Sequence, residues 1–337
     1  MRIITLSLLL CGLVIQSFGV RPPLKGYTYA SEQAPTGKEW QSPENLALNK
    51  EQPHAWFFPF QDIKSARKVL PENSIYWQSL NGNWKFNWAA DPDSRPKDFY
   101  KTDFDVTAWD NIPVPSSWNI YGVQQDGSLK YGVPIYVNQP VIFMHSVKAD
   151  DWRGGVMRTP PTNWTTYKYR NEVGSFRREF EIPEHWDGRE VFISFDGVDS
   201  FFYLWINGMY VGFSKNSRNT ANFNITNYLR SGKNIVAAEV YRNSDGSFLE
   251  AQDMFRLPGI FRTVALYSTP KVQIRDLVAT PDLDNNYTDG SLTIQADIRN
   301  FGKKTAKGYK VCYSLYANKL YSDENEPVIL ARDTKGA

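Results

Sequence analysis

Cysteine and histidine are scarce in this sequence of 337 residues, which contains two cysteines and three histidines. Cys312 is the only cysteine after Cys11, so a chain cleaved beyond Cys11 cannot form an internal disulfide and must be stabilised by packing. His54, His145 and His185 are far apart and have no cysteine or histidine partner at ligand spacing. The sequence therefore argues against a zinc site.

An excess of charge is also missing, with 38 basic and 36 acidic residues. The chain has no excess of positive charge that would attract nucleic acid, so a neutral partner is expected. Long hydrophobic runs are absent too, because residues 3–15 are too few for a membrane span of about 20 residues. With Arg2 before this run and Ser17-Phe18-Gly19 after it, the pattern predicts a signal peptide over residues 1–19. The protein is expected to be secreted or periplasmic, with no membrane contact after cleavage.

Aromatic residues, in contrast, are abundant at 15% of the chain. This composition fits the pleated surfaces of β-sheets, and it also fits platforms for the apolar faces of sugar rings. Residues 20–39 are polar and rich in Pro, Gly and Ser, which predicts a flexible lead-in before order begins near Trp40.

Short alternating segments broken by turn signals dominate the chain after this lead-in, and no helical period is sustained. Residues 201–206 and 209–213 are aromatic and β-branched runs joined by Asn207-Gly208, which predicts a hairpin. Charged residues alternate with Phe and Ile over residues 176–182, as in an exposed strand. The pattern predicts an all-β sandwich of two antiparallel sheets.

A second pattern begins after Thr269-Pro270. It predicts three more strands, at residues 272–277, 291–298 and 310–315. An immunoglobulin-like domain needs about 100 residues and seven strands, so residues 271–337 are expected to form an incomplete one. The Pro-rich and Trp-rich residues 145–169 are expected to form an insertion loop in the first domain, which spans residues 40–270.

Two loops carry candidate chemistry. Residues 244–262 combine carboxylates and guanidinia with apolar side chains, and such charges should be paired because an unpaired buried charge is costly. Asp245 is the exception, since a carboxylate at the first bend after a strand can project into a cleft and bind sugar hydroxyls or a hard cation. In residues 131–140, Asn138 offers a donor and an acceptor to a vicinal diol, although a simple turn residue would look the same.

Four segments together resemble the large β-galactosidases of glycoside hydrolase family 2 and occur in the order found in that family. They are residues 80–86 (LNGNWKF), 114–118 (VPSSW), 195–198 (FDGV) and 244–262 (SDGSFLEAQDMFRLPGIFR). Several long motifs in order are more specific than any single short one. The resemblance implies a jelly-roll sandwich, an immunoglobulin-like domain and a barrel that carries two catalytic glutamates.

The same resemblance assigns roles to Asp245 and Asn138, which match the residues that complete the galactose pocket of the barrel. Asp245 would also help to hold a sodium ion. The complete enzyme would use Na⁺ and Mg²⁺, act on β-galactosides as a retaining glycosidase and form a homo-oligomer. Neither glutamate motif is found in this chain, so no catalytic residue is expected here and the chain alone should be inactive.

Two alternatives stay open at this point. Related β-glucuronidases and β-mannosidases share the jelly roll, although residues 244–262 look closest to the β-galactosidase branch. A secreted, non-catalytic carbohydrate-binding module would also fit the aromatic-rich jelly roll.

Overall fold

A computed structural model of the chain describes residues 34–137, 171–250, 253–284, 286–317 and 328–336. The predicted signal peptide, most of the predicted lead-in, Asn138 and the predicted insertion loop lie outside these residues. Within them, no helix is long and apolar enough to cross a membrane.

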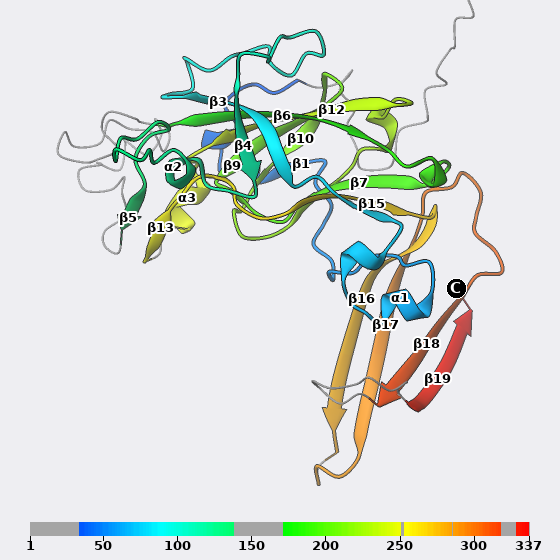
Figure 1. Cartoon of the computed structure of the whole chain (residues 1–337). Coiled ribbons are helices and arrows are strands. Elements are labelled where there is room, and N and C mark those ends of the chain that lie inside the picture. The colour runs from blue at the N-terminus through cyan, green and yellow to red at the C-terminus, as the bar shows by residue number, and fades with distance from the viewer. Residues whose placement is uncertain (1–33, 138–170, 251–252, 285, 318–327, 337) are drawn as a thin grey trace, which may run out of the picture.

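Two antiparallel sheets dominate the described part of the chain (Figure 1). The larger sheet has seven strands there, in the order β1 (Ala47–Leu48), β10 (Met209–Lys215), β9 (Phe201–Ile206), β12 (Lys233–Tyr241), β6 (Val173–Glu181), β3 (Gly82–Ala89) and β4 (Asp110–Val114). The smaller sheet has four, in the order β11 (Ala221–Asn224), β7 (Glu190–Phe195), β15 (Val264–Thr269) and β2 (Trp77–Ser79). The predicted all-β fold class is confirmed.

Short elements connect these strands. Two further strand pairs are β5 (Ile135–Val137) with β13 (Met254–Arg256) and β8 (Val198–Asp199) with β14 (Gly259–Ile260). The described helices are single turns: α1 (Ile63–Ala66), α2 (Trp118–Tyr121), α3 (Gly246–Leu249) and the 3₁₀ turns Glu39–Gln41, Pro71–Asn73, Glu184–Trp186 and Thr226–Tyr228. Helices this short depend on tertiary packing for their stability.

The predicted hairpin is confirmed by β9 and β10, in which Met209 pairs with Ile206. Asn207 and Gly208 both have positive φ, at 52° and 81°, as a two-residue hairpin loop with the favoured twist requires. Asn207 also fixes the loop to β12, because its side-chain oxygen accepts a hydrogen bond from the Ile235 backbone at 2.9 Å.

The main hydrophobic core lies between the two sheets. Alternate residues of β9, Phe202, Leu204 and Ile206, point into it with the core-facing residues of the other strands. The intervening residues of β9 belong to a second cluster on the other face of the larger sheet. We call this cluster the outer aromatic layer; it contains Trp40, Phe99, Val173, Phe201, Tyr203, Trp205, Tyr210, Phe213, Ala237 and Tyr241.

The exposed strand predicted at residues 176–182 is confirmed only in part, because Glu179 and Glu181 are exposed whereas Phe176, Arg177 and Phe180 are buried. This segment belongs to β6, which lies inside the larger sheet between β12 and β3. Arg177 is buried and donates to the backbone oxygens of Phe99, Thr102 and Phe104 at 3.1, 3.1 and 2.8 Å. A guanidinium can be buried in this way because backbone carbonyls satisfy its donors.

The three strands predicted after Pro270 are confirmed as β16 (Val272–Leu283), β17 (Gly290–Asn300) and β18 (Lys310–Ala317). β16 pairs with β17, and β18 pairs with a fourth strand, β19 (Val328–Gly336). These two hairpins extend away from the sandwich (Figure 1). The division of the chain into two domains at residue 270 stays a prediction.

Candidate functional site

Asp245 lies on the turn that follows β12, at the start of α3. Its backbone N–H donates to the carbonyl oxygen of Trp40 at 2.9 Å, so the turn is tied to the chain segment that precedes the sandwich. The turn closes locally because the Ser244 backbone N–H donates to the Ser247 hydroxyl at 3.0 Å. A short polar turn of this kind holds the carboxylate on a rigid sheet end.

The carboxylate of Asp245 forms an ion pair with Lys215 of β10. The ammonium lies 2.9 Å from Oδ1 and donates to Oδ2 at 3.0 Å, and it also donates to the carbonyl oxygen of Ser42 at 2.6 Å. The side chains of Asp245 and Lys215 are 14% and 3% exposed. Burial lowers the pKa of Lys215, against the opposing effect of Asp245. The two opposite charges compensate each other. Oδ1 of Asp245 is buried and, although the Lys215 ammonium lies near it, accepts no hydrogen bond from the described residues.

Asn138, the other predicted site residue, cannot be placed because it lies outside the described residues. The strand that leads to it, β5, pairs with β13, and Val137 stands opposite Met254. The two loops that carried candidate chemistry in the sequence are therefore joined in one small sheet. On that sheet, the exposed rings of Tyr136 and Phe255 lie side by side, with centroids 5.3 Å apart.

The remaining charges of residues 244–262 are paired, as expected, but mostly with uncharged groups. Glu250 accepts hydrogen bonds from the Ser217 backbone at 2.7 Å and from the Ser217 hydroxyl at 2.5 Å. Asp253 accepts from the Tyr136 hydroxyl at 2.5 Å, and Arg262 donates to the carbonyl oxygen of Arg218 at 2.8 Å. The segment is held by hydrogen bonds more than by salt bridges within itself.

A buried pair that the sequence analysis missed lies beside this segment. Glu172 and Arg242, both buried, form an ion pair at 2.5 Å, and the carboxylate also accepts from the indole N–H of Trp118 at 3.0 Å. Gly132 packs against Glu172 so closely that a Cβ there would lie 2.3 Å from its carboxylate oxygen. Trp118 belongs to one of the sequence motifs, and that was the only available signal for this pair.

Asp199 is the second missed carboxylate. It lies on β8, which pairs with β14 at the end of residues 244–262. Burial raises its pKa to about 6, while Arg218, whose Nη2 lies 3.3 Å from Oδ2, acts in the opposite direction. A perturbed buried carboxyl near a candidate site is a functional candidate in general, but structural ion pairs produce the same perturbation.

The described residues around Asp245 do not make a cation site by themselves. No group of three or more His, Cys, Asp or Glu side chains suited to a metal ion occurs among them. The ammonium of Lys215 lies 2.9 Å from the one carboxylate oxygen without a hydrogen bond, where it competes with a cation. A hard cation takes several oxygen ligands, so Asp245 fits such a site only as one ligand among others supplied from elsewhere.

Comparison with known proteins identifies the class of this sandwich. Residues 77–270, more than half of the chain, match the family model described as "Glycosyl hydrolases family 2, sugar binding domain". The chain therefore belongs to glycosyl hydrolase family 2, and its sandwich is the sugar-binding domain of that family.

Two relatives with similar sequences are β-galactosidases. The chain is 42% identical over 264 residues to a β-galactosidase of Priestia megaterium, which covers 78% of this chain and 24% of the relative. It is 32% identical over 296 residues to a β-galactosidase large subunit of Lactobacillus helveticus, covering 85% of this chain and 44% of that protein. The chain thus spans between about a quarter and a half of these relatives, in their amino-terminal part.

Solved structures agree on the fold. A β-glucuronidase of an uncultured Clostridium species matches with a TM-score of 0.51 and 17% identity, over 77% of this chain and 38% of that chain. A second family 2 β-glucuronidase gives the same TM-score at 19% identity, over 78% of this chain and 25% of that chain. At this identity the likeness concerns the fold alone.

Proposed function

We propose that this chain is the sugar-binding part of a secreted retaining β-galactosidase. The observation that carries the proposal is the 42% identity to a β-galactosidase over 264 residues of this chain. The hydrolysis itself requires two carboxyl groups about 5 Å apart, and a barrel downstream would provide them. The chain alone orients a sugar without cleaving it, because positioning without a nucleophile and an acid gives no meaningful hydrolysis.

Within this function, Asp245 is the residue of the chain that contacts the galactose hydroxyls, together with Asn138. Its position supports the role: it is held on a sheet end, and the chain continues from its turn to β13, which pairs with β5, the strand that leads to Asn138. Sodium is the cation that Asp245 would help to hold when the barrel and the Asn138 loop add further ligands. Mg²⁺ use and homo-oligomer formation are proposed for the complete enzyme on the family resemblance.

The first test is the coding sequence after residue 337. A barrel with two matching glutamates is expected there, and a stop codon with no such domain nearby would contradict the proposal that the chain belongs to an enzyme.

In the complete enzyme, Asp245→Asn keeps the volume of the turn but removes a charge-assisted contact worth about 1.5 to 3 kcal/mol, so kcat/KM should fall at least about tenfold. The measurement is made with and without added sodium.

Lys215→Met is the matched control, because it breaks the same ion pair without touching the atoms proposed to contact sugar. If Asp245 serves only as the partner of Lys215, both variants should lower the melting temperature and leave the kinetics of the folded enzyme unchanged. A loss of activity confined to Asp245→Asn supports the proposed contact with sugar.

A further inference from the structure

The outer face of the four-stranded sheet contains a cleft of about 370 Å³ that belongs to neither candidate loop. We call it the outer cleft. Its main lining residues are Trp56, Phe58, Trp77, Ser79, Asn81 and Asp196. A volume of this size falls within the range of small-molecule sites in proteins, about 300 to 1,000 Å³.

The strand register explains why the sheet is hollow at this place. Ala265 of β15 pairs with Ser79 of β2 on one side and with Ser194 of β7 on the other. Side chains that are paired across strands lie on the same face, so these three small residues form the floor of the cleft. In the next outward row, Tyr267 pairs with Trp77 and Phe192, and these large rings form a step at the edge of the floor.

Aromatic packing holds one wall of the cleft in place. Phe58 stands edge-on to Tyr267 with centroids 5.6 Å apart, and Trp56 stands edge-on to Phe58 at 4.9 Å. Trp56 nevertheless remains 58% exposed. An indole that is fixed by neighbouring rings but exposes much of its surface is suited to stacking against the apolar face of a ligand ring.

Hydroxyl, amide and carboxylate groups surround the floor. Ser194 donates to Oδ1 of Asp196 at 2.9 Å, and the amide of Asn81 donates to the hydroxyl of Thr263 at 3.2 Å. The only charged side chains that line the cleft, among the described residues, are the carboxylates of Asp196 and Glu72. A lining without Lys or Arg disfavours phosphate and acidic sugars, since an anion would meet like charge.

We propose that the outer cleft is a second carbohydrate site, which binds a neutral pyranose unit of an oligosaccharide by stacking on Trp56 and hydrogen bonding to Asp196 and Asn81. A neutral sugar ring has an apolar face, which packs on an aromatic ring, and hydroxyl groups, which form hydrogen bonds with carboxylate and amide groups. The outer cleft offers both kinds of partner. The proposal does not depend on Asp245, which lies on the turn after β12 of the other sheet. In this role the cleft would hold a distant part of a polymeric substrate, or the polymer to which the substrate is attached.

The test uses the whole chain and isothermal titration with galactotetraose and cellotetraose, two neutral probes. Binding of at least one with a Kd below about 10 mM is expected, and no binding of either up to that concentration overturns the proposal. Trp56→Ala should weaken binding at least about tenfold, equal to about 1.4 kcal/mol. Tyr309→Ala removes a ring that is 50% exposed and lies far along the chain, and it should leave binding unchanged.

Two further variants keep the answer clear. Asp196→Asn preserves the shape of the cleft and should weaken binding by severalfold, even if Trp56→Ala disturbs the local structure. Weaker binding by Asp245→Asn together with unchanged binding by Trp56→Ala would assign the sugar to the site at Asp245 and overturn the proposal. Stronger binding of tetragalacturonate than of both neutral probes would also overturn it.

Discussion

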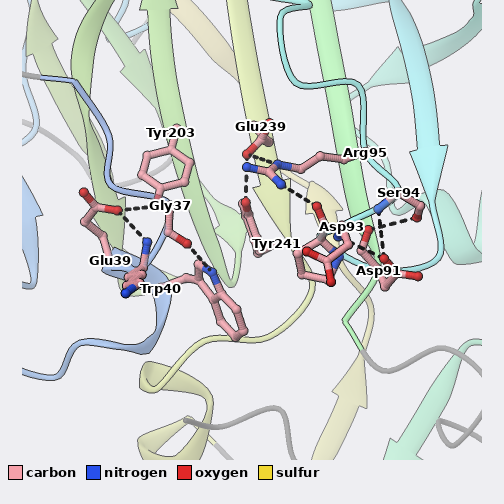
Figure 2. A network of polar contacts seen from close by, with 12 residues as sticks. Gly37, Glu39, Trp40, Asp91, Asp93, Ser94, Arg95, Tyr203, Glu239 and Tyr241 are labelled. Carbon is pink, nitrogen blue, oxygen red and sulfur yellow. Dashed lines mark hydrogen bonds and ion pairs between the residues drawn. The ribbon is translucent and has the colours of Figure 1, made fainter. Parts of the chain in front are cut away.

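The two outer faces of the sandwich are covered in different ways. On the larger sheet, residues 36–42 and 95–109 complete the outer aromatic layer and bring buried polar groups with them. Figure 2 shows this contact: Arg95 bonds to Glu239 at 2.9 Å, and the hydroxyl of Tyr241 donates to the same carboxylate at 2.8 Å. On the smaller sheet, residues 51–60 cover the aromatic row but leave the outer cleft open.

This difference shows what converts a sheet face into either core or binding surface. Where the face carries rings on successive strands, as on β9, β10 and β12, a covering segment gains enough buried area to close over it. Where small side chains form a row, as at Ser79, Ala265 and Ser194, a covering segment finds little to bury and the face remains hollow. Substitutions on the closed face should therefore mainly lower the stability of the fold, and substitutions on the open face should mainly weaken ligand binding.

The sharpest test of this comparison replaces one tryptophan on each face. Trp40 is 5% exposed, stacks on Tyr241 with centroids 5.6 Å apart and donates to the carbonyl oxygen of Gly37 at 3.0 Å. Trp40→Ala should lower the free energy of unfolding by about 3 to 5 kcal/mol. Trp56→Ala should cost about 1 kcal/mol or less, because that ring is mainly exposed.

Urea unfolding of both variants, followed by circular dichroism, measures these values. Equal losses for Trp40→Ala and Trp56→Ala would contradict the division between a closed face and an open face. A larger loss for Trp56→Ala would show that residues 51–60 are a structural cover, and that the outer cleft is part of the core.

A second prediction concerns the ion pair on the closed face. Burial raises the pKa of Glu239, and the Arg95 guanidinium opposes that effect. Arg95→Ala leaves Glu239 buried without its cation and should cost about 3 kcal/mol near neutral pH. The loss should shrink as the pH falls, because a protonated Glu239 needs no counter-charge. The exposed pair of Lys233 and Glu179 provides the control, and Lys233→Ala should cost far less than Arg95→Ala because water screens this pair.

Unfolding curves at several pH values test this prediction. A loss for Arg95→Ala that is no larger than the loss for Lys233→Ala would show that Glu239 is hydrated in solution. A loss that is independent of pH would indicate that Arg95 stabilises the protein by packing its aliphatic stem.

Much of the fold could be predicted from sequence because its signals are local. The Asn207-Gly208 loop and the alternation of β9 and β10 need only neighbouring residues to be recognised. The burial of Arg177 was missed for the opposite reason, since its guanidinium donates to carbonyl groups more than 70 residues away in sequence. A charged residue in a strand suggests solvent unless those partners are known.

The candidate site was predictable to a smaller degree. Asp245 stood out because a carboxylate follows a strong strand, but nothing in the sequence indicated that Lys215 would cover it. Glu172 and Asp199 were missed because their partners, Arg242 and Arg218, are distant in sequence or belong to no motif. The outer cleft depends on the register of three strands, and sequence alone does not provide that register.

The smallest predicted effect concerns Tyr203, whose hydroxyl donates to the carboxylate of Glu39 (Figure 2). Burial acts to raise the pKa of Glu39, but the hydrogen bonds from Tyr203 and the Thr36 backbone outweigh it and hold the pKa below its ordinary value. Tyr203→Phe removes one of these bonds and should cost about 1 kcal/mol near neutral pH. Trp40 keeps its stacking on Tyr241, with centroids 5.6 Å apart, and its carbonyl oxygen keeps the hydrogen bond from the Asp245 backbone at 2.9 Å, so the segment should stay attached.

The pH dependence gives this small effect its sign. A carboxylate with a lowered pKa contributes stability that is present above its ordinary pKa and is lost as the pH falls through the folded-state pKa. Tyr203→Phe should raise the pKa of Glu39 toward the ordinary value, so the variant and the parent protein should converge in stability in acid. Unfolding measured from neutral to acidic pH checks this, and a constant difference between the two proteins would mean that the loss does not come from the hydrogen bond of the Tyr203 hydroxyl to Glu39.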